Sequence, residues 1–246
     1  MAKRKIPPPP APAVARVLVV DVGGHHVKLL ATGRRQHRKF LSGPRLTPAA
    51  LLEGVRAATR DWDYDVVTMG YPGRVGDGLP LAEPHNLARG WVDFDFAAAF
   101  GRPVRVINDA AMQALGSYRG GSMLFLGLGT GLGSAMVING ELAPMELAHL
   151  PYRKNRTYED YVGERGYRRL GMAKWRHHVA AVVELLRAAL EPDEVVLGGG
   201  NVHKLHRLPR GVRRGDNNNA FRGGFRLWQV PVSAPAALLP SRRAAR

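Results

Sequence analysis

The sequence contains no cysteine, which excludes disulfide bonds and cysteine-ligated zinc sites and leaves the redox compartment open. It also lacks any apolar run near the ~20 residues that a membrane-spanning helix needs. Proline dominates residues 6–12 and interrupts the segment where a signal peptide would have its apolar core. These absences predict a cytoplasmic protein with no membrane partner and a disordered leader over residues 1–15.

Acidic residues are scarce: 20 Asp and Glu stand against 36 Lys and Arg, which gives a formal net charge of +16. A basic surface favours polyanionic partners such as nucleic acid, an anionic membrane or a phosphate-rich substrate. Arginine is scattered along the chain, so a genome-wide preference for arginine explains the charge equally well. The basic residues are not interleaved with aromatic ones, which disfavours non-specific nucleic-acid binding.

Strand and helix patterns alternate along the chain, which is long enough to bury a sizeable core in one large domain or two lobes. Before residue 120, strands are predicted at 16–21, 27–32, 37–41, 64–70 and 104–107, and helices at 48–62, 95–100 and 110–118. After it, strands are predicted from 123 and 132 and at 194–197, and helices at 157–170, 172–190 and 218–228.

Both halves begin with an apolar strand, a glycine-rich turn and a second strand. This repetition predicts two related α/β lobes, at residues 16–109 and 110–230, followed by a weakly ordered tail at 231–246. Ligands of such sheets bind at the strand ends, so we expect a site between the glycine turns of the two lobes.

Three glycine-rich turns each follow a predicted strand: residues 21–28, 126–134 and 198–201. Glycine lets backbone N–H groups approach an anion closely, and Asp21, at the end of its strand, could hold Mg²⁺. Any one of these turns taken alone could be an ordinary glycine-rich hairpin, but three together favour phosphate binding. Neither a P-loop nor a dinucleotide-binding fingerprint is present.

Asp109 lies between a predicted strand and a predicted helix, where a carboxylate can accept a proton from an attacking hydroxyl. It could equally cap the helix, and spacing alone favours the cap. Glu146 and His149 are three residues apart, close enough to bind neighbouring hydroxyls together. On sequence alone, a structural role for His149 is the simpler interpretation.

Taken together and in this order, the motifs resemble the ROK family of sugar kinases in the actin-like ATPase superfamily, and its polyphosphate glucokinase branch in particular. The resemblance covers residues 17–228. Asn108-Asp109-Ala110 matches the family's Asn-Asp-Ala, and residues 146–149 are similar to its Glu-x-Gly-His. Residues 71–74 resemble its sugar-side loop, and residues 86–91 its Asn-Leu-x-x-x-Trp segment.

The resemblance implies an α/β fold of the two-lobed actin-like ATPase (ribonuclease H-like) class, with the active site in the cleft between lobes. It implies transfer of a phosphoryl group from polyphosphate, ATP or both to the 6-hydroxyl of glucose or a related hexose, with Mg²⁺, in a homodimer. It now favours Asp109 as catalytic base over Asp109 as cap.

The same resemblance assigns residues to each part of the site. The sugar side comprises Gly73, Asn108, Glu146, His149 and Glu159. The phosphate or nucleotide side comprises Gly23, Gly24, His25, Lys28, Gly129, Thr130, Gly131, Gly133, Gly199 and Gly200, with Asp21 for Mg²⁺. His25 stands where the family usually has Thr or Ser, which leaves open a catalytically weak or inactive sugar-binding or sensor protein.

Overall fold

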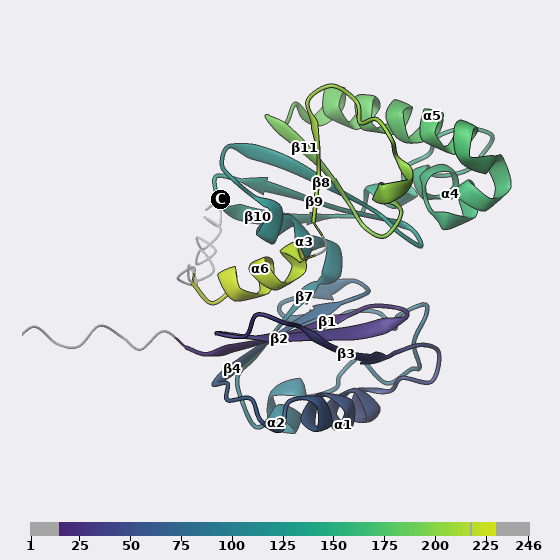
Figure 1. The fold of residues 1–246 in the computed structure, drawn as a ribbon. Coiled ribbons are helices and arrows are strands. Elements are labelled where there is room, and N and C mark those ends of the chain that lie inside the picture. Colours follow the sequence, from purple (N-terminus) through teal and green to yellow (C-terminus); the bar gives the residue numbers. More distant parts are fainter. Residues whose placement is uncertain (1–14, 217, 230–246) are drawn as a thin grey trace, which may run out of the picture.

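The computed structural model describes residues 15–216 and 218–229, which form two α/β lobes stacked one above the other (Figure 1). The leader predicted at 1–15, except its last residue, and the tail predicted at 231–246 lie outside the described residues. Each lobe is built on a five-stranded sheet, in the orders β3-β2-β1-β4-β7 and β10-β9-β8-β11-β12. The two-lobed α/β fold expected from the sequence is therefore confirmed.

The first sheet contains β1 (Val17–Val22), β2 (His26–Ala31), β3 (Arg38–Leu41), β4 (Val66–Tyr71) and β7 (Val104–Asn108). Strand β1 is buried along its whole length because it is nearly all apolar and pairs on both sides, antiparallel with β2 and parallel with β4. Helices α1 (Pro48–Ala58) and α2 (Phe96–Phe100) cover the face of this sheet that points away from the second lobe (Figure 1).

The second sheet contains β8 (Ser122–Leu128), β9 (Leu132–Ile138), β10 (Glu141–Met145), β11 (Glu194–Gly198) and β12 (Val212–Arg214). Helices α4 (Tyr158–Val162) and α5 (Glu164–Leu190) cover its outer face (Figure 1). An apolar stripe of α5 that includes Trp175 and Val179 is buried against this sheet, as the sequence pattern indicated.

The two sheets share one topology. In each, the first three strands form antiparallel pairs and two later strands add in parallel beside the first. The glycine turns β1–β2 and β8–β9 consequently occupy equivalent places in the two lobes, which supports the prediction that the lobes are related. The lobe boundary predicted at residue 109 stays a prediction.

Two helices, α3 (Asp109–Ser117) and α6 (Asn219–Arg226), lie between the sheets and join the lobes (Figure 1). Helix α6 packs on α3 and also on β1 and β4 of the first sheet. A buried cluster here combines side chains of both lobes: Val17, Val19, Met112, Phe125, Ala220 and Phe221.

Several elements differ from the sequence predictions. Strands β10 and β12 and the small hairpin of β5 (Val75–Gly76) and β6 (Leu79–Pro80) were missed, because their short segments lack strong alternation. The helix predicted at 157–170 divides at Gly163, which is extended and lies against the carbonyl of Thr130. The break predicted at residue 171 is present as a kink, where Gly171 has a φ of 76°. Among the described helices, none combines the length and apolar character that crossing a bilayer demands.

Candidate active site

Asp109 is the first residue of α3, directly after β7, and the preceding residue caps the helix in its place. The Asn108 side-chain oxygen accepts a hydrogen bond from the Ala111 N–H at 3.0 Å, and its amide donates to the carbonyl of Gly73 at 3.0 Å. The cap interpretation of Asp109 is therefore wrong, because Asn108 performs that function. The Asp109 carboxylate accepts a hydrogen bond from the N–H of Ala110, at 2.8 Å.

The surroundings of Asp109 raise the pKa of its carboxyl group from 3.8 to about 7. Burial is the largest cause, followed by the negative charge of Asp21 and, more weakly, that of Glu146. Two carboxylates from other parts of the chain, Asp21 and Glu146, thus act on Asp109. A carboxyl group that titrates near neutral pH suits general base catalysis.

Asp21 is buried at the end of β1, and its direct partner across the sheet is Lys28 of β2. The Lys28 ammonium nitrogen lies 3.7 Å from an Asp21 carboxylate oxygen. Burial raises the pKa of Asp21, and the charge of Lys28 opposes that shift. Lys28, predicted on the phosphate side, therefore also pairs with the carboxylate predicted to hold Mg²⁺.

The first glycine turn joins β1 to β2. The Gly23 N–H donates to the carbonyl of His26 at 3.0 Å, and Ser42 donates its hydroxyl to the Gly23 carbonyl at 2.5 Å. The His25 side chain is exposed at this turn. A side chain added at Gly24 would contact Asn86. The fold thus brings the 86–91 segment against the first turn.

The second glycine turn, between β8 and β9, is joined to the third glycine cluster by Asn201. The Asn201 side chain donates to the carbonyl of Gly129 at 3.0 Å, and its backbone N–H donates to that of Leu128 at 2.8 Å. Gly199 and Gly200 precede Asn201 directly and so lie at the same turn. The two clusters predicted to bind phosphate or nucleotide form one continuous surface.

Glu164 fixes this surface and was missed by the sequence predictions. Its carboxylate accepts hydrogen bonds from Arg168 and Asn201, each at 3.0 Å, and from Lys204 at 3.3 Å. These partners, Arg168 first, lower its pKa. No local pattern marks Glu164, because Asn201 and Lys204 reach it from a distant part of the chain.

Two close approaches place the second turn beside the other predicted site residues. A Cβ atom built on Gly133 would lie 2.6 Å from the Cβ of Ala110, the residue after Asp109. A Cβ atom on Gly131 would overlap the carboxylate of Glu159. The turn therefore adjoins the start of α3, and Glu159, predicted on the sugar side, lies against the turn itself.

Glu146 and His149 stand at the two ends of a short 3-10 segment, with the His149 Nε2 and Glu146 Oε2 atoms 3.9 Å apart. Both side chains are more than half exposed, His149 at 70% and Glu146 at 55%, so His149 is not a buried structural histidine. The buried Ser134 hydroxyl donates to the Met145 carbonyl at 2.9 Å and accepts the Leu147 N–H at 3.1 Å. Ser134 thereby fixes both residues that flank Glu146.

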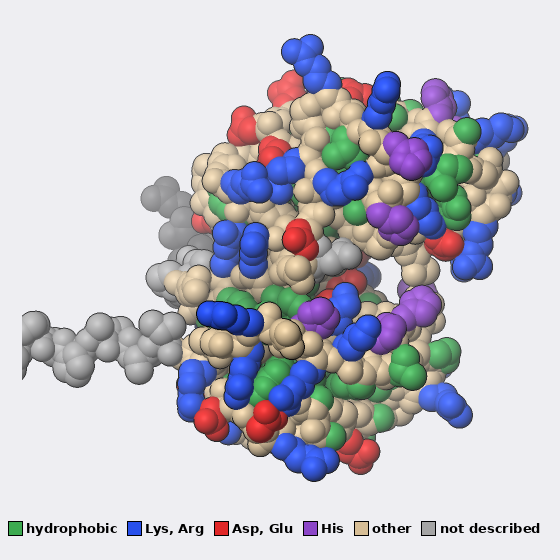
Figure 2. All heavy atoms as spheres, in the orientation of Figure 1, with side chains coloured by type: hydrophobic (Ala, Val, Ile, Leu, Met, Phe, Trp, Pro, Cys, Tyr) green, Lys and Arg blue, Asp and Glu red, His purple; other side chains and the backbone are tan. Residues whose placement is uncertain are grey.

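The described residues contain no group of three or more acidic, histidine or cysteine side chains able to enclose a metal ion. This arrangement still fits Mg²⁺, which binds through one or two carboxylates together with substrate phosphates and water. Asp21 supplies such a carboxylate between the first turn and Asp109. A hollow between the two lobes is visible at the right of Figure 2.

Comparisons with known proteins identify relatives that match about half of this chain or more. The ROK family model matches residues 17–144, just over half of the sequence. A polyphosphate glucokinase of Mycobacterium tuberculosis (strain H37Rv) is 27% identical over 202 residues, covering 74% of this chain and 76% of that protein.

Two solved structures share the fold. An inorganic polyphosphate/ATP-glucomannokinase from Arthrobacter sp. strain KM has a TM-score of 0.75 at 22% identity, covering 87% of this chain and 98% of that one. A ROK family glucokinase from Streptomyces griseus, in complex with glucose and AMPPNP, has a TM-score of 0.70 at 17% identity, covering 86% and 98%.

Proposed function

The chain belongs to the ROK family, and we propose that it transfers a phosphoryl group from polyphosphate, ATP or both to the 6-hydroxyl of glucose or a related hexose. The observation that carries this proposal is the Asp109 carboxyl group, with a pKa raised to about 7, beside Asp21 and the second glycine turn. The names of the relatives support glucose as acceptor and both donors.

In the proposed reaction, Asp109 accepts the proton of the sugar hydroxyl as its oxygen attacks the terminal phosphorus of the donor. Glu146 and His149 hold other sugar hydroxyls, and the backbone N–H groups of the two glycine turns hold the donor phosphates. Asp21 would hold Mg²⁺, which when bound offsets negative charge on the donor phosphates.

The test is an assay of the purified protein with several hexoses and Mg²⁺, crossed with ATP, GTP and long-chain polyphosphate. Turnover of glucose with polyphosphate supports the full proposal. Turnover with ATP alone supports phosphoryl transfer to the sugar and excludes polyphosphate as the donor. If no pair reacts while calorimetry detects sugar binding, the protein is the catalytically inactive sugar-binding descendant suggested by His25.

The pH dependence of kcat/KM should report the titration of Asp109. The base must be ionised to accept a proton, so we expect activity to fall as the pH drops through about 7 and to level off above it. Initial rates measured across this range at constant ionic strength provide the check. A profile that is flat down to pH ~5 would exclude a base with this pKa.

We expect Ser134→Ala to weaken hexose binding without changing donor binding. The substitution leaves the Met145 carbonyl and the Leu147 N–H without their shared partner, so Glu146 loses its fixed position. The KM for the hexose should rise roughly tenfold, in line with ~1–2 kcal/mol for such bonds. Ser122→Ala is the matched control, because Ser122 makes similar bonds to Asp193, on the β11 side of the sheet.

A further inference from the structure

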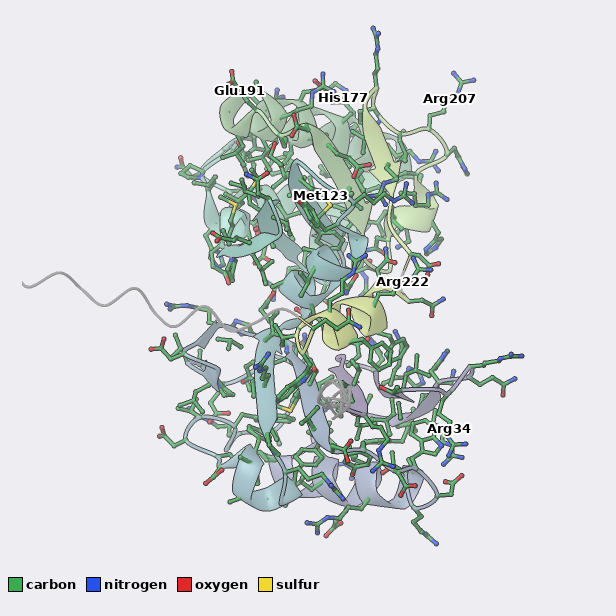
Figure 3. All side chains as sticks on the ribbon, turned by 90° about the vertical axis from the view of Figure 1, so that its left-hand side faces the viewer. Arg34, Met123, His177, Glu191, Arg207 and Arg222 are labelled. Carbon is green, nitrogen blue, oxygen red and sulfur yellow. The ribbon has the colours of Figure 1, made fainter. Side chains whose placement is uncertain are left out.

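A cavity of about 550 Å³ lies between the turn after β2 and helix α6. Its polar wall comprises Arg35 and His37 from the turn and Arg222 from α6. The ring of His37 lies 5.8 Å from that of Phe221, which forms part of the apolar floor. Arg222 and the turn residue Arg34 project on the same side of the molecule in Figure 3.

The cavity continues a row of basic side chains along one face of the first sheet. Lys28 of β2 is paired directly with Lys39 of β3, and Leu30 and His37, the residues next to the last pair of this ladder, both line the cavity. Side chains two residues apart on a strand share a face, and directly paired residues share one too. Lys28 therefore faces the same side as its other partner, Asp21, and the row leads from the active site to the cavity.

Little negative charge balances this row. Lys28 pairs with Asp21, but no ion pair involves Arg35, Lys39 or Arg222 among the described residues. One nearby carboxylate, Asp216, accepts the backbone N–H of Asn218 at 2.8 Å at the start of α6. Segments 1–14 and 230–246 contain no Asp or Glu in their sequence, so they add no acidic side chain.

We propose that this basic row, Lys28, Lys39, His37, Arg35 and Arg222, binds an extended polyphosphate chain whose reacting end lies at the glycine turns. The inference rests on the proposed function, since it names a donor for that site. Lys28 and Lys39 are direct cross-strand partners, whose Cβ atoms are typically about 5 Å apart, and His37, Arg35 and Arg222 line the cavity beyond them. The row therefore presents several neighbouring basic side chains to a polyanion.

Polyphosphate fits the row better than single-stranded nucleic acid does. Proteins that bind single strands combine basic grooves with exposed aromatic rings on which bases stack. Of the two phenylalanines that line the cavity, Phe221 is only 4% exposed and Phe225 is half-buried, so neither offers an open platform. Figure 2 shows Lys and Arg side chains across this face of both lobes, where they outnumber the acidic side chains.

The test removes three charges of the row that lie outside the catalytic site, with the triple variant Arg35→Gln, Lys39→Gln, Arg222→Gln. Binding of fluorescently labelled long-chain polyphosphate is followed by anisotropy in the absence of sugar. We expect Kd to rise at least ~10-fold and the salt dependence of log Kd to become shallower by about 2. KM for ATP should be unchanged.

A control variant removes the same charge from exposed positions of the other lobe: Lys174→Gln, Arg207→Gln, Arg210→Gln. The Kd of this control for polyphosphate should change less than ~2-fold, because charges far from the bound polyphosphate are screened by salt and contribute little. The proposal would be contradicted if polyphosphate binding were weakened equally in both triple variants, or were not weakened in the first. It would also be contradicted if the unmodified protein bound no polyphosphate.

Binding and turnover separate this inference from the proposed function. One possible result is that the protein phosphorylates no sugar, while only the first triple variant binds polyphosphate more weakly. Polyphosphate binding by the row would then be supported, and the kinase proposal would be wrong. If single-stranded DNA of equal charge displaces the labelled polyphosphate equally well, the row is a general polyanion surface and its assignment to polyphosphate is wrong.

Discussion

Asp109→Asn should reduce kcat for sugar phosphorylation by about 10²- to 10⁴-fold, the usual contribution of a positioned general base. Asparagine keeps the shape of the side chain and an oxygen that can accept the Ala110 N–H, but it cannot take the hydroxyl proton. KM for the hexose should change much less, because Glu146 and His149 remain in place. Initial-rate kinetics with saturating donor measure both constants.

The same variant should fold at least as well as the unmodified protein, which separates lost chemistry from lost structure. The pKa of Asp109 in the folded state, about 7, exceeds its ordinary value of 3.8, so between these values the folded state binds more protons than the unfolded state. The stabilising contribution of this group is therefore lost as the pH rises through that window.

Removing the charge should accordingly make Asp109→Asn more stable than the unmodified protein at pH 8 and about equally stable at pH 4. Thermal unfolding at both pH values is the measurement. A variant with near-full activity would show that Asp109 is not the base. A variant that is inactive and also less stable at pH 8 would contradict the electrostatic account of its surroundings.

Gly116→Ala should destabilise the junction between the lobes, the second large effect that we expect. A Cβ atom on Gly116 of α3 would overlap the carbonyl oxygen of Asn219, and one on Gly223 of α6 would overlap that of Met112. The obstructing atoms belong to the backbone, so the helices must move apart. Overpacking costs about 1–3 kcal/mol or more, whereas the gain in helix propensity is at most ~1 kcal/mol.

We therefore expect a net loss on the order of 2 kcal/mol and a Tm lower by roughly 4–8 °C. Activity should fall as well, because α3 carries Asp109. Ala188→Ser, at an exposed position of α5, also adds one heavy atom and should stay within about 0.5 kcal/mol of the unmodified protein. A melting temperature that matches or exceeds the starting value would show that α3 and α6 separate at little cost.

The sequence by itself determined the strands that begin each lobe, the three glycine turns and the position of Asp109 between a strand and a helix. These features depend on short stretches of chain, since apolar runs favour buried strands and glycine permits tight turns wherever they occur. The repeated order of strand, glycine turn and strand was sufficient to predict two related lobes.

Only the tertiary structure decided the rest. It assigned the helix cap to Asn108, brought the Asp21 and Glu146 charges to bear on Asp109, and fixed the second glycine turn through Glu164 and Asn201. It also aligned the basic row with the cavity beside α6. The cap is a local contact, but Asn and Asp both cap helices well, so the sequence could not decide between Asn108 and Asp109. The other features depend on residues far apart in the chain, whose distances in space and shielding from water no local pattern encodes.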